Sequence, residues 1–436
     1  MTKQRFLDPL YGPISIDDRT WALIFSPEFQ RLRYVRLCNI NSLFLTGASE
    51  PKRFEHCVGV YHLANLWAAS RSLSTRQVEV VRAAALLHDI QTGPFGHSFQ
   101  YVMEDNPFEQ RFEHTNLASG VRTRFLQRSA WAASFSGRRF ITSDLLGDLA
   151  SDVFTAIEGR GALGPIISGT LDLDNLDNVV RLAFHMGLCG DSDRDLPRSL
   201  APMLEPTDDG LAAPRAALPL FERWFEIRRE LYEYLLLDRG EFAAKAMLTL
   251  AVERAVAAQL LGPDDWRLTD EELLENLHDR SVGEHQVIGQ LIKRLKVGDL
   301  FECIAVWQSP TVSDYSQLSE ALAKRELEHV IEERLTGAGL HKLRVCVHYI
   351  LDKKKTCRSI AFRVLKTEED VIVGHDSSNL LVGVFVENAR ATGLTPSERL
   401  RACEVIKVVL EGKGLANISL APDPLSVPSD DTRLLV

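Results

Sequence analysis

The sequence has no long uninterrupted hydrophobic run and no paired cysteines. No apolar stretch approaches the roughly 18 residues that suggest a membrane span, and the N-terminal MTKQRFLDPLYG lacks the apolar core of a signal peptide. We therefore expect a cytoplasmic protein with no membrane partner. The seven cysteines are an odd number without any C-x-x-C pair, which excludes a disulfide framework and a zinc knuckle.

Positive charge is also in short supply. Lys and Arg number 50 against 60 Asp and Glu, so the net charge is −10. Such a chain has no overall attraction to nucleic acid or an anionic membrane, and any phosphate-binding site must be local. With 436 residues, 45% of them hydrophobic, the chain is long enough for a large core, and its length favours two domains.

The pattern from about residue 17 to 335 is helical almost throughout, with apolar residues three and four apart. In SLSTRQVEVVRAAALLHDI, Ser74 is expected to cap a helix and Gln77 to complete a capping box. His88 continues the apolar stripe of that helix and is expected to point inward at its last turn.

After about residue 338 the sequence becomes rich in alternating β-branched residues, which predicts strands near 343–350, 359–366 and 380–388. DKKKT is expected to form a hairpin turn, and Thr395 with Glu398 to cap a final helix before a short strand near Ile418. We predict a mainly α fold: a helical unit at 1–337 and a smaller α+β unit at 338–436 that serves assembly or regulation.

Three His-Asp dipeptides occur in the chain, so the dipeptide by itself is a weak signal. His278-Asp279 ends an acidic, surface-type helix, and His375-Asp376 is expected in a turn between strands. Only His88-Asp89 ends an apolar helix.

Two other helical segments carry polar residues on apolar faces. His56 shares a stripe with apolar residues, and Asp174, Asp177 and Arg181 share a second face. Buried charges are costly unless they are paired or bind a metal. The set therefore indicates one cation site, and imidazoles with carboxylates suit Mn, Fe, Zn or Ni. The alternative is a group of separately satisfied polar core residues.

Six segments follow one another along the chain: FQRLRYVRL (29–37), TGASEPKRFEHCVGVYHLA (46–64), AALLHDIQTGPFGHSF (84–99), FEHTNLASG (112–120), LDLDNLD (171–177) and RRELYEYLLLDRGEFAAKAML (228–248). In this order they resemble the HD-domain deoxynucleotide triphosphohydrolases, in particular the branch of the sterile-alpha-motif and HD-domain dNTPase without its sterile-alpha-motif domain. The resemblance covers about residues 6–335.

The resemblance implies one divalent metal ion (Mn, Fe, Zn, Ni or Mg) held by His56, His88, Asp89 and Asp174. In such enzymes a water activated by the metal attacks the α-phosphorus of a dNTP and releases triphosphate. His97 and His114 would join Asp89 as catalytic residues, with His114 as general acid. Arg53 would contact phosphate. The resemblance also implies a homo-oligomer and a nucleotide effector.

The sequence departs from the family pattern mainly at positions that recognise the substrate in the family. Gln91-Thr92 replaces a Gly-His pair, Leu37 replaces the glutamine that reads the sugar, and Asn175 and Asn178 replace a phosphate-binding lysine and a sugar-stacking tyrosine; Thr115 and Gln100 replace two acids. The loss of one cation and one buried hydrogen bond predicts altered substrate preference. The predicted substrate-binding residues are Arg53, Leu37, Thr92, Asn175, Asn178 and Arg181.

Three functions stay open on the sequence. The first is a metal-dependent nucleotide phosphohydrolase of dNTP triphosphohydrolase type with altered substrate preference. The second is a phosphodiesterase or exonuclease on single-stranded nucleic acid, which the acidic net charge disfavours. The third is a catalytically degenerate HD subunit that binds a nucleotide or a partner.

Overall fold

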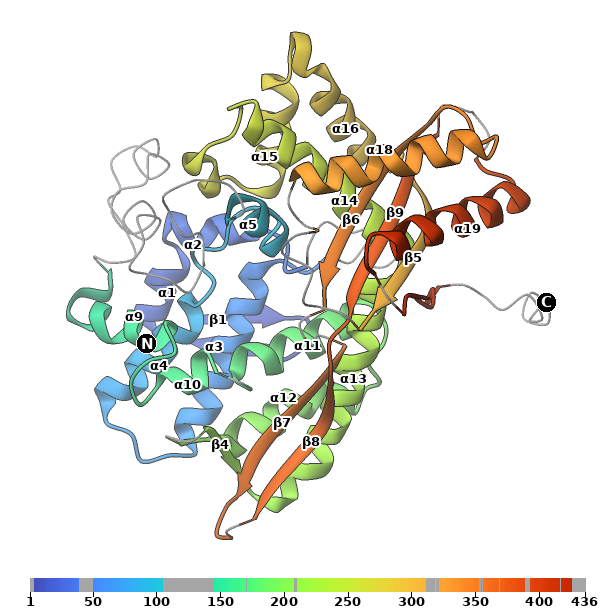
Figure 1. Ribbon diagram of the computed structural model, residues 1–436. Helices are drawn as coiled ribbons and strands as arrows, with labels where there is room; N and C mark the ends of the chain where they lie inside the picture. The colour runs from blue at the N-terminus through green and yellow to red at the C-terminus, as the bar shows by residue number, and fades with distance from the viewer. Residues whose placement is uncertain are drawn as a thin grey trace, which may run out of the picture.

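The fold is mainly helical, with three small sheets (Figure 1). The predicted fold class, a mainly α chain with a smaller C-terminal α+β unit, is confirmed. His114 and Thr115 lie outside the residues that the structure describes. Described in this computed structural model are residues 4–38, 50–104, 145–169, 171–207, 210–310, 318, 321–352, 354, 356–367, 369–388, 393–415 and 417–425.

A helical bundle forms the first part of the chain and begins with a two-stranded hairpin. α3 packs against α4 and α11, and α11 packs against α13, so one apolar core runs through these helices. The bounds are β1 (Gln4–Asp8), β2 (Gly12–Ile16), α1 (Asp18–Ile24), α2 (Pro27–Arg31), α3 (Arg53–Ala69), α4 (Thr75–Leu87), α5 (His97–Glu104), α9 (Ala150–Ile157), α10 (Gly164–Ile167), α11 (Leu173–His185), α12 (Leu196–Leu200) and α13 (Leu218–Leu237).

Helix α4 begins and ends as the sequence predicts. The Ser74 side chain accepts a hydrogen bond from the Gln77 backbone N–H, and the Gln77 side chain accepts one from the Ser74 backbone N–H, which completes the capping box. The helix ends at Leu87 with His88 as its C-cap. The capping box therefore fixes the register that turns His88 inward.

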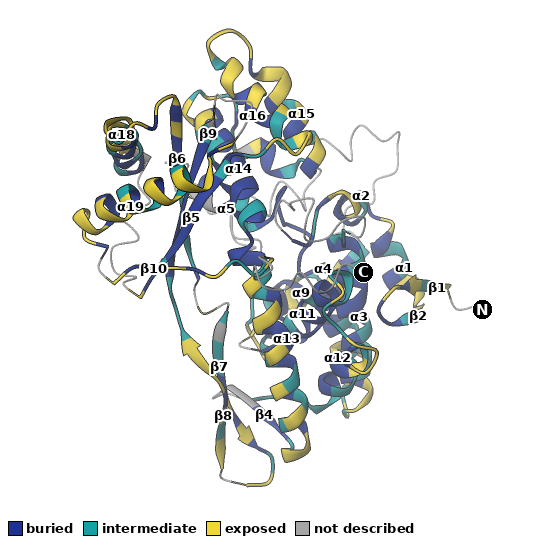
Figure 2. Cartoon of the chain, turned by 90° about the vertical axis from the view of Figure 1, so that its right-hand side faces the viewer, coloured by how far each residue is buried: buried dark blue, intermediate teal, exposed yellow. Residues whose placement is uncertain are grey.

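Helices α14 to α16, a four-stranded antiparallel sheet and the helices α18 and α19 follow the bundle. The sheet has the order β10-β5-β9-β6; α14 packs against one face, and α18 and α19, side by side in Figures 1 and 2, cover the other. The bounds are α14 (Arg239–Ala257), α15 (Asp270–Arg280), α16 (Gln286–Lys296), β5 (Glu302–Ser309), α18 (Ala321–Gly337), β6 (Leu343–Leu351), β9 (Leu380–Asn388), α19 (Pro396–Gly412) and β10 (Ser419–Leu420).

Strand β5 lies in the stretch whose pattern predicts helix, and that prediction is wrong there. The segment ECIAVWQS is buried on both faces of the sheet: Val306 packs toward α14, while Ile304 and Trp307 pack toward α18 and α19. A strand covered on both faces has a continuous apolar run instead of an alternating one. A short run of that kind cannot be told from a buried helix by periodicity.

A third sheet, of order β3-β4-β7-β8, joins distant parts of the chain. Its strands are β3 (Glu205–Thr207), β4 (Gly210–Ala213), β7 (Cys357–Val364) and β8 (Asp370–Ser377), and β4 pairs with β7 in parallel. Strands from both predicted units thus share a sheet, and the boundary at 337/338 stays a prediction.

The C-terminal strands differ from the predicted hairpin. The segment DKKKT connects β6 to β7, but these strands belong to different sheets and do not pair with each other. His375-Asp376 lies inside β8 instead of in a turn. The helix predicted from Thr395 is confirmed, with its capping box to Glu398. No helix in the described parts of the chain is long and apolar enough to cross a membrane.

Candidate metal centre

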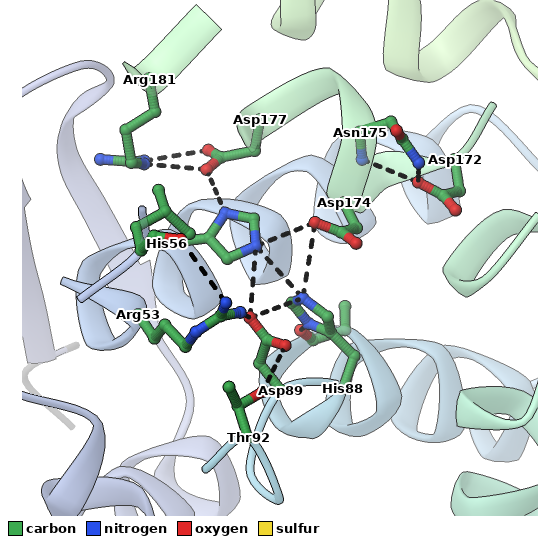
Figure 3. A network of polar contacts seen from close by, with 12 residues as sticks. Arg53, His56, His88, Asp89, Thr92, Asp172, Asp174, Asn175, Asp177 and Arg181 are labelled. Carbon is green, nitrogen blue, oxygen red and sulfur yellow. Dashed lines mark hydrogen bonds and ion pairs between the residues drawn. The ribbon is translucent and has the colours of Figure 1, made fainter. Parts of the chain in front are cut away.

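Three helices bring four predicted metal ligands together in the core of the bundle. His56 lies in the first turn of α3, His88 and Asp89 follow the last turn of α4, and Asp174 lies in the first turn of α11 (Figure 3). The Nε2 atom of His56 lies 3.2 Å from His88 Nε2, 3.0 Å from Asp174 Oδ1 and 3.8 Å from Asp89 Oδ2. His88 Nε2 lies 3.7 Å from both carboxylates. The donor atoms of His56, His88 and Asp174 are therefore close enough to hold one ion, and Asp89 Oδ2 lies beside both imidazoles.

Hydrogen bonds on the far side of each imidazole determine which nitrogen faces that position. His88 Nδ1 lies 2.8 Å from the Ala85 carbonyl oxygen, and His56 Nδ1 lies 2.7 Å from Asp177 Oδ1. Both partners only accept hydrogen bonds, so each Nδ1 carries a proton, and each Nε2 is the nitrogen left to bind a cation: a metal ion or, without one, a second proton. Two lone pairs that face each other at 3.2 Å require a cation or a proton between them.

The charges around His56 also attract a cation. Burial alone would lower the pKa of His56, but its hydrogen bonds to Asp174 and Asp177 outweigh burial and raise the pKa to about 9. Burial would likewise lower the pKa of His88, but the charge of Asp89 and a hydrogen bond to Asp174 outweigh burial and raise it. Two imidazoles with two carboxylates are a donor set that fits a divalent transition metal. The residues present therefore fit the predicted ion.

Two side chains donate hydrogen bonds to the Asp89 carboxylate. Arg53, at the start of α3, donates a hydrogen bond to Asp89 Oδ2, and the Thr92 hydroxyl donates to Asp89 Oδ1 at 2.9 Å. Arg53 is 9% exposed and Thr92 3%, so both bonds are shielded from water. Thr92, predicted to bind substrate, here orients a candidate ligand.

A buried ion pair stands behind His56. Asp177 accepts two hydrogen bonds from Arg181, at 2.8 and 2.9 Å, and Arg181 also lies 3.0 Å from Asp8 Oδ2. Burial would raise the pKa of Asp177, but the charge of Arg181 and the His56 bond lower it to about 2. Arg181, predicted to bind substrate, is fully buried on the Nδ1 side of His56, opposite the candidate metal position. Such partners of a ligating histidine fix its tautomer and orientation.

Gly59 makes room for this ion pair, because a Cβ at Gly59 would lie 2.2 Å from Arg181 Nη2 and 2.3 Å from Asp177 Oδ2. We expect Gly59→Ala to lower the free energy of unfolding by about 3–5 kcal/mol, the cost of breaking a buried pair. Chemical denaturation checks this value. Gly262→Ala is the control, because its Cβ would meet nothing within 4 Å; equal stability losses in both variants would contradict the clash.

The remaining predicted residues surround the centre at different distances. Leu37 is buried and its carbonyl oxygen lies 3.5 Å from Arg53 Nη2. Asn175 donates to Asp172, the N-cap of α11, through its backbone and its side chain. Asn178 lies one turn after Asp174 on α11. His97 Nδ1 lies 3.0 Å from Gln100 Oε1 in the first turn of α5, and the structure does not describe His114.

Two residues near the centre were absent from the predicted site. Cys57 Sγ lies with His88 and Asp89 as a second group that could hold a metal ion, and burial raises the pKa of its thiol. No motif marks a lone cysteine after a histidine as a ligand. Asp177 was predicted only to share a face with Asp174. Its 3-residue spacing from Asp174 and 4-residue spacing from Arg181 were the available signal.

Sequence comparison identifies an HD domain at residues 53–163. The chain is 25% identical to YwfO of Bacillus subtilis over 256 residues, which are 57% of this chain and 55% of that protein. It is 21% identical over 443 residues to a deoxynucleoside triphosphate triphosphohydrolase SAMHD1 homolog of Dictyostelium discoideum, covering 96% of this chain and 81% of the relative. The match to YwfO thus spans about half of that relative's length.

Structure comparison finds the same fold in a phosphohydrolase from Bacteroides thetaiotaomicron. The TM-score is 0.64 at 19% identity, over 88% of this chain and all of that one. At this identity the likeness concerns the fold.

Proposed function

We propose that this HD-domain phosphohydrolase, a distant homologue of the SAMHD1-type dNTP triphosphohydrolases, hydrolyses nucleotides by a metal-dependent reaction of dNTP triphosphohydrolase type with altered substrate preference. The observation that carries the proposal is the convergence of His56 Nε2, His88 Nε2 and two carboxylates beside the buried Arg53 guanidinium. A divalent ion bound there would neutralise phosphate charge and activate water as a nucleophile.

The residues of this chain would prepare that reaction. Asp177 and the Ala85 carbonyl hold both imidazoles in the tautomer that offers Nε2. Arg53, already at the rim of the donor set, would contact a phosphate oxygen. We assign His114 as general acid to the leaving oxygen and His97 as a second polar group near the phosphate, as their motif positions imply.

The altered substrate preference is attributed to four positions. Thr92 stands in place of a histidine and has no imidazole to offer a phosphate. Its hydroxyl donates a hydrogen bond to Asp89 instead. Leu37 offers an apolar side chain, and Asn175 is engaged with Asp172. Asn178 differs from these, since its buried Oδ1 has no hydrogen-bond partner among the residues that the structure describes. A buried acceptor of this kind is favourable only when something bonds to it, and a sugar hydroxyl is a suitable donor.

Assembly forms part of the proposal. We propose a homo-oligomer with a nucleotide effector, supported by the resemblance alone. Nucleic acid stays a possible partner that the acidic net charge of −10 disfavours.

The test is metal content followed by hydrolysis of a panel of dNTPs and NTPs, with the products separated. We expect close to one divalent ion per chain and release of triphosphate with a nucleoside from a subset of the panel. Release of pyrophosphate or single phosphate instead would place the attacked bond elsewhere and reject the triphosphohydrolase type. A metal-loaded protein that leaves the whole panel intact while it shortens end-labelled oligonucleotides would reject the nucleotide substrate.

A further inference from the structure

The turn that begins at Asp89 is held by a segment about 175 residues later in the chain. This ligand turn (residues 89–96) leads into α5, and the segment 266–270 leads into α15. Trp266 is 2% exposed, and its indole Nε1–H donates a hydrogen bond to the Gln91 carbonyl oxygen at 2.8 Å. A Cβ at Gly93 would lie 2.8 Å from the Trp266 ring. Glycine at this position therefore lets the indole pack directly on the turn.

Arg31 joins the same two segments. Its guanidinium donates to the Leu268 carbonyl oxygen at 3.0 Å, and it also donates to the carbonyl oxygens of Ile90, at 3.4 Å, and of Thr92. Arg31 is buried, and hydrogen bonds from a charged donor are stronger than those between neutral groups. Trp266 and Arg31 therefore both tie the ligand turn to the segment before α15.

Asp270 stabilises a strained residue of the ligand turn. Phe95 has a φ of +53°, a conformation that residues with a large side chain rarely adopt. Such a conformation persists only where the surrounding structure holds it. Asp270 Oδ1 accepts a hydrogen bond from the Phe95 backbone N–H at 2.7 Å, and Asp270 is buried. The first residue of α15 thus helps to determine the shape of the turn.

The ligand turn contains or contacts both side chains that orient Asp89. The Thr92 hydroxyl donates a hydrogen bond to Asp89 (Figure 3). Gly96 lies so close to Arg53 that a Cβ there would be 2.7 Å from Arg53 Nη2, and Arg53 donates to Asp89 Oδ2. A shift of the turn would therefore disturb both hydrogen bonds that place this carboxylate.

The ligand turn also connects two hydrophobic cores. The helices α3 and α11, which carry His56 and Asp174, pack in the core of the helical bundle. Phe95 and Phe99 pack instead in a second core, together with Trp266 and with residues of α14, α15 and β5. The rings of Phe99 and Trp266 stack at 5.8 Å. The candidate metal centre is thus held from both cores.

We propose that Trp266 and Asp270 are positioning residues of the metal centre, through which the second core controls how tightly the centre binds its ion. Neither residue is a candidate ligand, and each acts through the backbone of the ligand turn. The inference deepens the proposed function, because it rests on the metal centre which that function uses. It does not depend on which nucleotide is hydrolysed.

The test is metal titration of the full chain without nucleotide. Trp266→Phe keeps an aromatic ring but removes the Nε1–H donor. We expect metal affinity to fall about tenfold, the lower end of the 10–100-fold loss that follows removal of a group orienting a metal ligand. Trp224→Phe is the matched control, because Trp224 is also buried but its Nε1 has no hydrogen-bond partner among the described residues. It should bind metal as the wild type does.

Asp270→Asn tests the same turn through a smaller change. It weakens the acceptor of the Phe95 N–H and should lower metal affinity in the same direction. Because both substitutions act on one turn, the double variant should lose less affinity than the product of the two single losses. Wild-type affinity in Asp270→Asn would contradict the role of Asp270.

A spectroscopic readout separates positioning from a general loss of stability. Coupling between two sites is reciprocal, so an ion that binds more tightly because of Trp266 should change the surroundings of Trp266. In protein labelled with fluorotryptophan, the fluorine NMR signal that Trp266→Phe removes should shift when Zn²⁺ is added, and the Trp224 signal should not. Equal metal affinity in the two tryptophan variants, or an unchanged Trp266 signal, would overturn the proposal. If no nucleotide is hydrolysed but Trp266→Phe still loses metal affinity, the proposed function fails and the positioning role is supported.

Discussion

The His88→Ala variant is expected to lose bound metal and nucleotide hydrolysis together. His88 supplies one of the two Nε2 lone pairs that face each other at 3.2 Å, and no other described side chain offers a nitrogen at that point. We expect hydrolysis to fall by at least about 10³-fold, at the upper end of the 10²–10³-fold cost of removing one electrostatic stabiliser. The loss is this large because the bound ion would both neutralise phosphate charge and activate water as a nucleophile.

Thermal unfolding gives a second readout that does not depend on turnover. Metal at 100 times its Kd should add about 2.7 kcal/mol to the stability of the wild type, whereas His88→Ala should gain almost nothing. His62→Ala is the matched control, because it removes a half-buried imidazole from α3 away from the four ligands; burial lowers the pKa of His62 to about 4. If His88→Ala still bound one ion per chain, the assignment of this centre would be wrong.

Local sequence signals predict the helices that carry the ligands, because their information lies within a few residues. The capping boxes at Ser74 and Thr395 are confirmed, and each depends on one side chain and its partner three residues later. The stripes of α3 and α4 turn His56 and His88 inward because apolar neighbours at helical spacing must be buried. These are contacts in which residue separation fixes the geometry.

Contacts between distant segments determine the features that these local signals miss, namely the identity and the pairing of some strands. β5 is covered by α14 on one face and by α18 and α19 on the other. Its apolar run therefore lacks the alternation that identifies strands. β7 pairs with the neighbouring β8 and, across about 150 residues, with β4, instead of with β6. The connecting segment DKKKT carries no information about that choice.

In the candidate site, too, the sequence predicts local arrangement but not the contacts between helices. The sequence places Asp174, Asp177 and Arg181 on one helical face, but it cannot tell which side of His56 each will contact. Asp174 meets Nε2 and Asp177 meets Nδ1, so only the first faces the metal position. Arg181 therefore stabilises the ligand set from behind, a place that helical spacing alone does not distinguish from a substrate contact.

Asp177→Asn is expected to be the most destabilising single change at this centre. It removes the charge that Arg181 meets at 2.8 and 2.9 Å and weakens the bond that holds His56 Nδ1 at 2.7 Å. Breaking a buried ion pair by removing one partner costs about 3–5 kcal/mol, and loss of a group that orients a metal ligand lowers metal affinity about 10–100-fold. Denaturant unfolding and metal titration measure the two effects separately.

The pH dependence of the stability and a comparison with a second ion pair test whether the buried charge of Asp177 causes this loss. The pKa of Asp177 is lowered to about 2, so its stabilisation is complete above its unfolded value of about 3.9 and is lost as pH falls through about 2. The stability gap between wild type and Asp177→Asn should therefore shrink between pH 4 and 2. Asp193→Asn, which breaks the partly exposed bidentate pair with Arg223, should cost about 0–1 kcal/mol. Equal losses in the two variants would show that burial of the Asp177–Arg181 pair does not determine its contribution.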